Sequence, residues 1–166
     1  MDVVVWIVIG LLAAGTLVLL WNRIVQFLQS TLLPLVRRLL GDTVADFAVN
    51  IVSFLDKRVC PAREVLLSAW KTFKYHVLAI RTVYKKRDSH TASATTEAFV
   101  RTAEGKVVKQ TKEEVVAWHD LPDDIRQQMM AKATTTATVD DMDVVEGRLR
   151  ERMQEEGMEL TLADAT

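Results

Sequence analysis

The chain has 166 residues, of which 49% are hydrophobic and 26% are charged, and its formal net charge at pH 7 is −1. These averages are those of one ordinary globular domain, and the single cysteine, Cys60, excludes an internal disulfide framework and a cysteine zinc site. The average charge conceals a difference between the halves, because residues 1–90 carry a net +6 and residues 91–166 a net −7. Such asymmetry indicates that the two halves face different surroundings.

The first predicted element is a membrane-spanning helix over residues 3–22, VVVWIVIGLLAAGTLVLLWN, which contains no charged residue. About 20 apolar residues at a rise of about 1.5 Å each cross a hydrocarbon layer of roughly 30 Å. Trp6 and Trp21 lie near its two ends, and tryptophan favours the membrane interfaces. The acidic start and the length of the run favour a retained anchor over a cleaved signal peptide. We therefore expect residues 1–22 to form a transmembrane anchor.

The charges on either side of this segment predict its orientation. Asp2 is the only charged side chain before it, whereas Arg23, Arg37 and Arg38 follow. Basic flanks remain on the cytoplasmic side of a membrane. The sequence therefore predicts a single-pass membrane protein with its N-terminus outside and its C-terminal region cytoplasmic.

Residues 23–40 carry the stripe of an amphipathic helix, because their apolar side chains recur at steps of three and four. One interpretation places this helix on the anionic inner leaflet, with leucines at the acyl boundary and arginines at lipid phosphates. The predicted membrane-interface residues are then Trp6, Trp21, Arg23, Phe27, Leu28, Arg37 and Arg38. The other interpretation packs the same stripe into a cytosolic helical bundle. Pro34 permits a kink in either case.

Two further amphipathic helices are predicted next, over residues 44–55 and residues 61–86, separated by Gly41-Asp42 and Cys60-Pro61. Together with the stripe before them they form a predicted membrane-proximal helical region, residues 23–87. Its apolar surface exceeds what one short helix needs, so the acidic half, a second copy or another subunit is expected to cover it.

The acidic half begins with a predicted polar linker, residues 88–97, and continues as a cytosolic module, residues 98–166. Within the module, AFVRTAEGKVVKQ predicts a β-hairpin that turns at a glycine. Thr111 and Glu114 fit a capping box and predict a helix from Lys112. Asp120 before Leu-Pro predicts a second helix start.

A last helix is expected after the capping pattern of Thr138 and Asp141, ending at Gly157, with a short strand over 158–162. The predicted fold class is thus mainly α: one transmembrane helix, membrane-proximal amphipathic helices and a small C-terminal α+β module.

The acidic module contains the predicted partner-binding residues. Methionine-rich amphipathic helices adapt to partners, and a tryptophan near a turn is a suitable anchor. The residues that we assign to partner binding are Trp118, Leu121, Ile125, Met129, Leu149 and Met153.

No motif for catalysis, cofactor binding or metal binding is present: there is no glycine-rich phosphate loop, no metal-ligand pair at helical spacing and no Ser-His-Asp arrangement. The basic, aromatic-rich run from Lys71 to Arg87 fits anionic lipid better than nucleic acid. The segment WHDLPDDI, residues 118–125, resembles the Leu-Pro turn of small helical ubiquitin-binding motifs over some twenty residues. That resemblance implies a binder of small ubiquitin-like folds.

These observations favour a non-enzymatic, membrane-anchored accessory subunit or adaptor, which recruits a cytosolic or membrane protein partner through its C-terminal module. The expected partners are anionic lipid of the inner leaflet and a protein, with a homo-oligomer as a further possibility and no nucleic acid. The alternative is a self-associating membrane effector that perturbs the bilayer.

Overall fold

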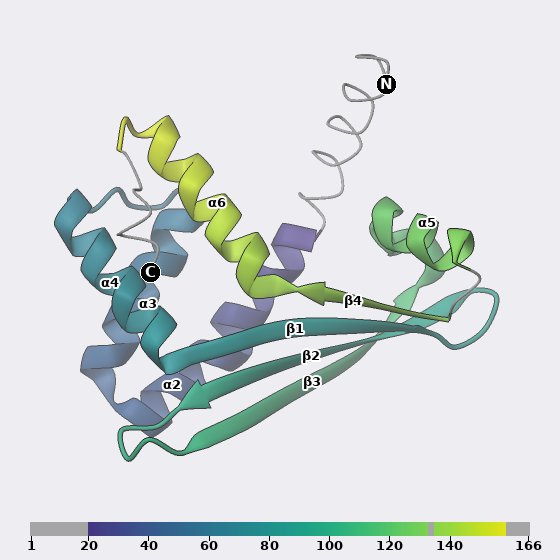
Figure 1. Ribbon diagram of the computed structural model, residues 1–166, viewed down its shortest axis with the longest axis horizontal. Helices are drawn as coiled ribbons and strands as arrows, with labels where there is room; N and C mark the ends of the chain where they lie inside the picture. The colour runs from purple at the N-terminus through teal and green to yellow at the C-terminus, as the bar shows by residue number, and fades with distance from the viewer. Residues whose placement is uncertain (1–19, 133–134, 159–166) are drawn as a thin grey trace.

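Four antiparallel strands form one sheet, in the order β3-β2-β1-β4 (Figure 1). The computed structural model describes residues 20–132 and 135–158. The strands are β1 (Val77–Lys86), β2 (Thr91–Arg101), β3 (Val107–Ala117) and β4 (Thr136–Asp140). The first three form a meander, and β4 returns to pair with the free side of β1. The fold of the described residues is therefore α+β.

The helices precede the meander, connect β3 to β4, and follow β4. The described part of the chain starts inside a helix at Leu20, which continues through a π-helical turn, η1 (Leu28–Leu32), into α2 (Leu33–Leu40). Pro34 follows this turn and has no backbone N–H to donate to it. The remaining helices are α3 (Asp42–Leu55), α4 (Arg63–His76), the 3-10 turn η2 (Trp118–Asp120), α5 (Asp123–Ala131) and α6 (Asp141–Glu155).

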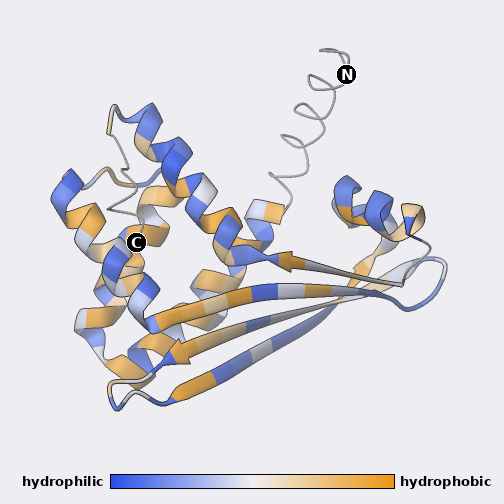
Figure 2. Cartoon of the chain, viewed as in Figure 1, coloured by the Kyte–Doolittle hydropathy of each residue, from blue (hydrophilic) through white to orange (hydrophobic). Residues whose placement is uncertain are grey.

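Alternation along the strands gives the sheet one apolar face, and Figure 2 shows hydrophobic and hydrophilic residues alternating along them. Ile80 lies opposite Ala98 and Tyr84 opposite Ala94, and all four side chains are buried. Successive side chains of a strand point to opposite faces, so the residues between them face the other way. In Figure 1 the helices of the described residues lie on one side of the sheet. The opposite face is left uncovered by any described element.

Two hydrophobic cores lie between the sheet and the helices. Core 1 joins the helices from Leu20 to Phe73 with the end of the sheet where β1 begins, and it includes Val145, Leu149 and Met153 of α6. Core 2 lies at the other end of the sheet, where α5 packs on Tyr84, Ala92, Ala94 and Ala137. Residues of the basic and the acidic half therefore share core 1, which explains what covers the apolar surface of residues 23–87.

The prediction of a mainly α chain was wrong. The predicted helix over 61–86 ends at His76, and residues 77–86 form β1, a strand in the middle of the sheet. The spacing of Val77, Ile80 and Tyr84 fits a helix, but Ile80, Thr82 and Tyr84 equally fit the alternation of a strand. Pairing with β2 and β4 on both sides decides between the two.

Two other assignments change for the same reason. The predicted linker over 88–97 contains most of β2. The helix predicted from Lys112 is instead the second half of β3, so the interpretation of Thr111 and Glu114 as a capping box was wrong. The hairpin was predicted correctly at its turn, where Gly105 has a φ of +80°, but its strands are longer than expected. The presence of α5 and α6 and the end of α6 at Gly157 were predicted correctly, but Asp120, predicted as the start of a helix, lies in η2, and the N-cap of α5 is Pro122. The predicted strand over 158–162 lies outside the described residues, apart from Met158.

The expectation of a single-pass membrane protein is not upheld by the described residues. The predicted span, residues 3–22, lies outside them except for its last three positions. Across 20–132 and 135–158, no helix has both the length and the hydropathy needed to cross a membrane. Phe27 and Leu28, predicted to enter lipid, are 3% and 1% exposed within core 1. The amphipathic stripe therefore packs against the chain's own helices and sheet and not against lipid.

A substitution of Leu149 tests whether α6 packs on core 1 as part of the fold. Its side chain is 0% exposed in core 1, so Leu149→Ala should lower the free energy of unfolding by about 2–5 kcal/mol. Val65→Ala, at a side chain 45% exposed on α4, is the matched control and should change it by less than about 0.5 kcal/mol. Urea denaturation followed by circular dichroism measures both. Equal stability of the two variants would show that α6 is not packed as described.

Candidate functional site

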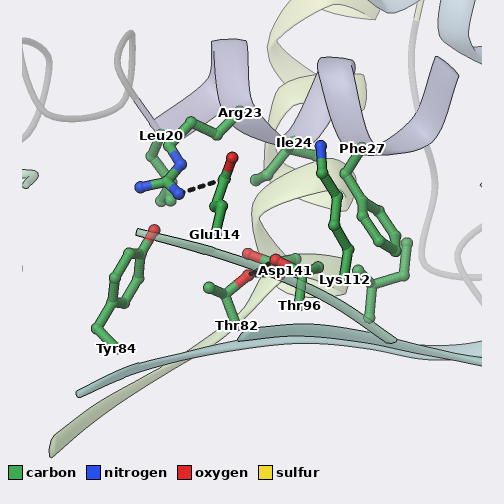
Figure 3. A pocket seen from close by; sticks show the side chains of 11 residues that line it. Leu20, Arg23, Ile24, Phe27, Thr82, Tyr84, Thr96, Lys112, Glu114 and Asp141 are labelled. Carbon is green, nitrogen blue, oxygen red and sulfur yellow. Dashed lines mark hydrogen bonds and ion pairs between the residues drawn. The ribbon is translucent and has the colours of Figure 1, made fainter. Parts of the chain in front are cut away.

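A buried polar cluster lies between the N-terminal helix, the sheet and the start of α6 (Figure 3). Its central side chains are Arg23 of the helix, Tyr84 of β1, Glu114 of β3 and Asp141 of α6. The register of the sheet brings these together, because Glu114 and Tyr84 both lie opposite Ala94 of β2.

Arg23 connects the helix to two strands of the sheet. Its Nη2 atom forms an ion pair with Glu114 Oε1, and its Cζ lies 5.5 Å from the centroid of the Tyr84 ring. Nη1 is buried and has no hydrogen-bond partner within the described residues. Arg23 was predicted to contact lipid, whereas the structure places it against the chain's own sheet. Removing Arg23 would leave Glu114 without its cation in a partly buried position.

Asp141 is the most enclosed charged side chain of the cluster, with an exposed fraction of 0%. Its Oδ2 accepts a hydrogen bond of 2.6 Å from Thr82 Oγ1. The Thr82 hydroxyl has only one hydrogen, so it accepts, at 3.0 Å, the hydrogen bond from Thr96. The donors therefore run in one direction, from Thr96 through Thr82 to Asp141. Asp141 Oδ1 has no hydrogen-bond partner within the described residues.

Burial determines the protonation of this cluster. Loss of hydration raises the pKa of the Asp141 carboxyl from 3.8 to about 7, against the lowering effect of the Thr82 hydrogen bond and of Arg23. Burial also raises the pKa of Tyr84 to about 12, partly offset by Arg23. At neutral pH the tyrosine is therefore un-ionised, and Asp141 is close to the midpoint of its titration.

The cluster encloses too little space for a substrate. Its cavity volume is about 10 Å³, which is close to the least that holds one water molecule. Among residues 20–132 and 135–158, no group of three or more His, Cys, Asp or Glu side chains is arranged to hold a metal ion. The arrangement can hold or release a proton at Asp141 and can fasten the N-terminal helix and α6 to the sheet.

The residues predicted to bind a partner fall into two separate places. Leu121, Ile125 and Met129 are buried in core 2, and Leu149 and Met153 are buried in core 1. Trp118 alone among the six is only partly buried. Its ring packs on core 2 and lies 4.9 Å from Lys86 Nζ.

The remaining predicted membrane-interface residues lie at three different places. Trp21 packs against core 1, and Arg148 Cζ lies 5.8 Å from the centroid of its ring. Arg37 and Arg38 are exposed beside a shallow depression of about 490 Å³, and Arg37 Nε lies 3.3 Å from Asp42 Oδ1. Trp6 lies outside the described residues. The structure thus does not gather this set on one surface.

Sequence reasoning missed Tyr84, Glu114 and Asp141 as a group. Asp141 was assigned to a capping pattern with Thr138, but the cap of α6 is Asp140, which accepts hydrogen bonds from the backbone N–H groups of Met142 and Asp143. The one signal in the sequence that could have indicated this cluster is that a second aspartate, Asp141, directly follows the capping residue Asp140. Its partner Thr82 lies 59 positions away and is brought close only because β4 pairs with β1.

Comparison of the chain with family models, with curated proteins and with solved structures found no match. The geometry of the chain itself is therefore the basis for a functional proposal. That geometry consists of an enclosed polar cluster, a partly exposed tryptophan at the end of β3, and a sheet covered on one face only.

Asp141 predicts a pH dependence of stability. Because its pKa is higher in the folded state than in the unfolded chain, the folded state binds more protons between about pH 4 and pH 7. The contribution of Asp141 to the free energy of unfolding therefore decreases as the pH rises through this interval, by up to about 4 kcal/mol.

Asp141→Asn removes the titration while its side-chain oxygen still accepts from Thr82. Urea denaturation at pH 4.5, 6 and 8 should show that the wild type loses stability relative to this variant as the pH rises. Parallel curves for the two proteins would contradict the burial of an ionisable Asp141. Asp143→Asn, at the exposed third position of the same helix, is the control and should follow the wild type.

Proposed function

We propose that the chain is a non-enzymatic accessory subunit or adaptor, which recruits a protein partner through its C-terminal half. The observation that supports this proposal most is the contrast between the two candidate sites. The buried polar cluster leaves space for about one water molecule, whereas Trp118 is only partly buried.

Trp118 is held rigidly enough to act as an anchor. Its backbone N–H donates to the carbonyl of His90 at 2.7 Å, which ties the turn after β3 to the connection between β1 and β2. Lys86 restrains one side of the ring and core 2 the other. A large side chain that loses little conformational entropy on binding is typical of energetically important interface residues.

The surroundings of Trp118 indicate the chemistry of the partner. Asp120, within η2, and Asp124, in the first turn of α5, are both exposed and lie close to Trp118 in the chain. An indole beside carboxylates suits a partner with an apolar pocket and a basic rim. We define Trp118, Asp120 and Asp124 as the α5 surface.

The test is a comparison of two exposed aromatic positions. The tagged full chain is purified from its source cells after crosslinking, the captured protein is identified, and its affinity for the purified chain is measured by calorimetry. Trp118→Ala should weaken binding at least about tenfold. Tyr75→Ala, at a side chain 58% exposed on α4 at the other end of the sheet, should bind as the wild type does.

Trp118→Phe controls for a loss of local packing, because it keeps an aromatic ring on core 2. Circular dichroism of each variant establishes that it is folded. A partner that binds Trp118→Ala and the wild type equally well would contradict the proposal, and so would turnover of a small molecule by the purified chain.

A further inference from the structure

Strand β3 forms an edge of the sheet over eleven residues, and no described element pairs with its outer side. The direction of its backbone groups follows from the two ends of the β2–β3 hairpin. The N–H of Thr102 donates to Lys106, and the N–H of Trp118 donates to His90. Hydrogen-bonded pairs alternate along an antiparallel ladder, so the even-numbered residues of β3 bond to β2. The N–H and C=O groups of the odd-numbered residues point outward from the edge.

The odd-numbered side chains of β3 also face the uncovered side of the sheet. In order they are Val107, Lys109, Thr111, Glu113 and Val115. This series is symmetric in chemistry about Thr111, because an apolar residue lies at each end and opposite charges flank the centre. Val107 and Val115 are 55% and 58% exposed, which is unusual for valine on a sheet.

We propose that a second copy of this chain pairs with β3 along its outer edge, antiparallel and centred on Thr111, so that two sheets join into one. In this arrangement Val107 lies opposite Val115 of the second copy, and Lys109 lies opposite its Glu113. The odd-numbered residues, whose backbone groups point outward, are then directly opposed to one another as hydrogen-bonded pairs.

The charges select this alignment over its neighbours. Moving the centre to Gln110 places Val107 opposite Glu113, and moving it to Lys112 places Lys109 opposite Val115. Glu113 makes no ion pair within the described residues, whereas Lys109 Nζ lies 2.6 Å from Glu97 Oε1. Glu97 in turn lies 3.9 Å from Arg81. Pairing about Thr111 therefore extends an alternating series of charges, Arg81, Glu97, Lys109 and then Glu113 of the second copy.

The occupant of this edge is a second copy because the complementarity is internal to β3. An unrelated extended peptide would satisfy the backbone groups, but it would have no reason to present Val, Glu, Thr, Lys and Val in the opposing order. The edge is distinct from the α5 surface, so this inference goes beyond the proposed function. A monomeric chain would leave the role of Trp118 untouched.

A charge exchange tests the pairing. Sedimentation velocity of the full chain over a range of concentrations should show a monomer–dimer equilibrium. Glu113→Lys opposes two lysines at each of two symmetric positions and should weaken the dimer at least about tenfold. The double variant K109E/E113K restores opposite charges across the edge but removes the ion pair of Lys109 with Glu97, so it should recover part of the dimer affinity that Glu113→Lys loses. A wild-type chain that stays monomeric would overturn the proposal, as would a dimer unaffected by Glu113→Lys.

A disulfide trap tests the alignment itself in a Cys60→Ser background. Thr111→Cys lies on the two-fold axis, where opposed Cα atoms in a hydrogen-bonded pair are about 5.5 Å apart, within the range that a disulfide spans. Mild oxidation should therefore crosslink two chains at this position. Val115→Cys is also at an exposed position but lies opposite Val107, so it should remain largely uncrosslinked. Crosslinking at Val115 in preference to Thr111 would refute this alignment.

Discussion

The fold depends on the alternation of side chains along β1 and β2, because it gives the sheet a largely apolar face toward the helices. An antiparallel sheet of this kind must cover its apolar face. Helices from both ends of the chain do so, and α6 reaches core 1 only because β4 returns to the free side of β1. The basic and acidic halves therefore form one structure, and their opposite charges meet in contacts such as the ion pair of Arg23 with Glu114.

The polar cluster has the same origin. Where the N-terminal helix crosses the sheet, side chains of the covered face include Thr82, Thr96 and Glu114 besides the apolar ones. Each needs a partner, since an unpaired polar group is costly in a protein interior. Thr96 bonds to Thr82, whereas Asp141 and Arg23 supply the partners of Thr82 and Glu114 from two helices that are distant in sequence. The cluster thus specifies where both helices lie on the sheet, at the expense of an aspartate whose charge is disfavoured by burial.

Local signals predicted the presence of α5 and α6, the ends of α2 at Gly41 and of α6 at Gly157, and the turn at Gly105, but they did not predict the residues that cap the starts of α5 and α6. They did not predict β1 or the full lengths of β2 and β3. Residues 77–84 fit both periods, and TASATTE, 91–97, combines small and β-branched residues in a way that also suits a linker. Only the pairing of these segments with one another distinguishes the alternatives. The candidate site could not be predicted either, because its central residues come from four elements that only the pairing of the strands brings together. The six predicted partner-binding residues were correctly recognised as apolar and periodic, but five of them form core rather than surface.

Residues 107–117 form an edge strand with one shielded and one open face. Single cysteines at each position from 108 to 116, in a Cys60→Ser background, report this directly through their rates of reaction with a maleimide. We expect an alternation of period two, with faster reaction at odd-numbered positions, whose side chains are exposed, than at even-numbered ones, which face the helices. This alternation holds in a monomer and in the proposed dimer. A period of three to four residues would instead show a helix after Thr111 and would contradict the fold.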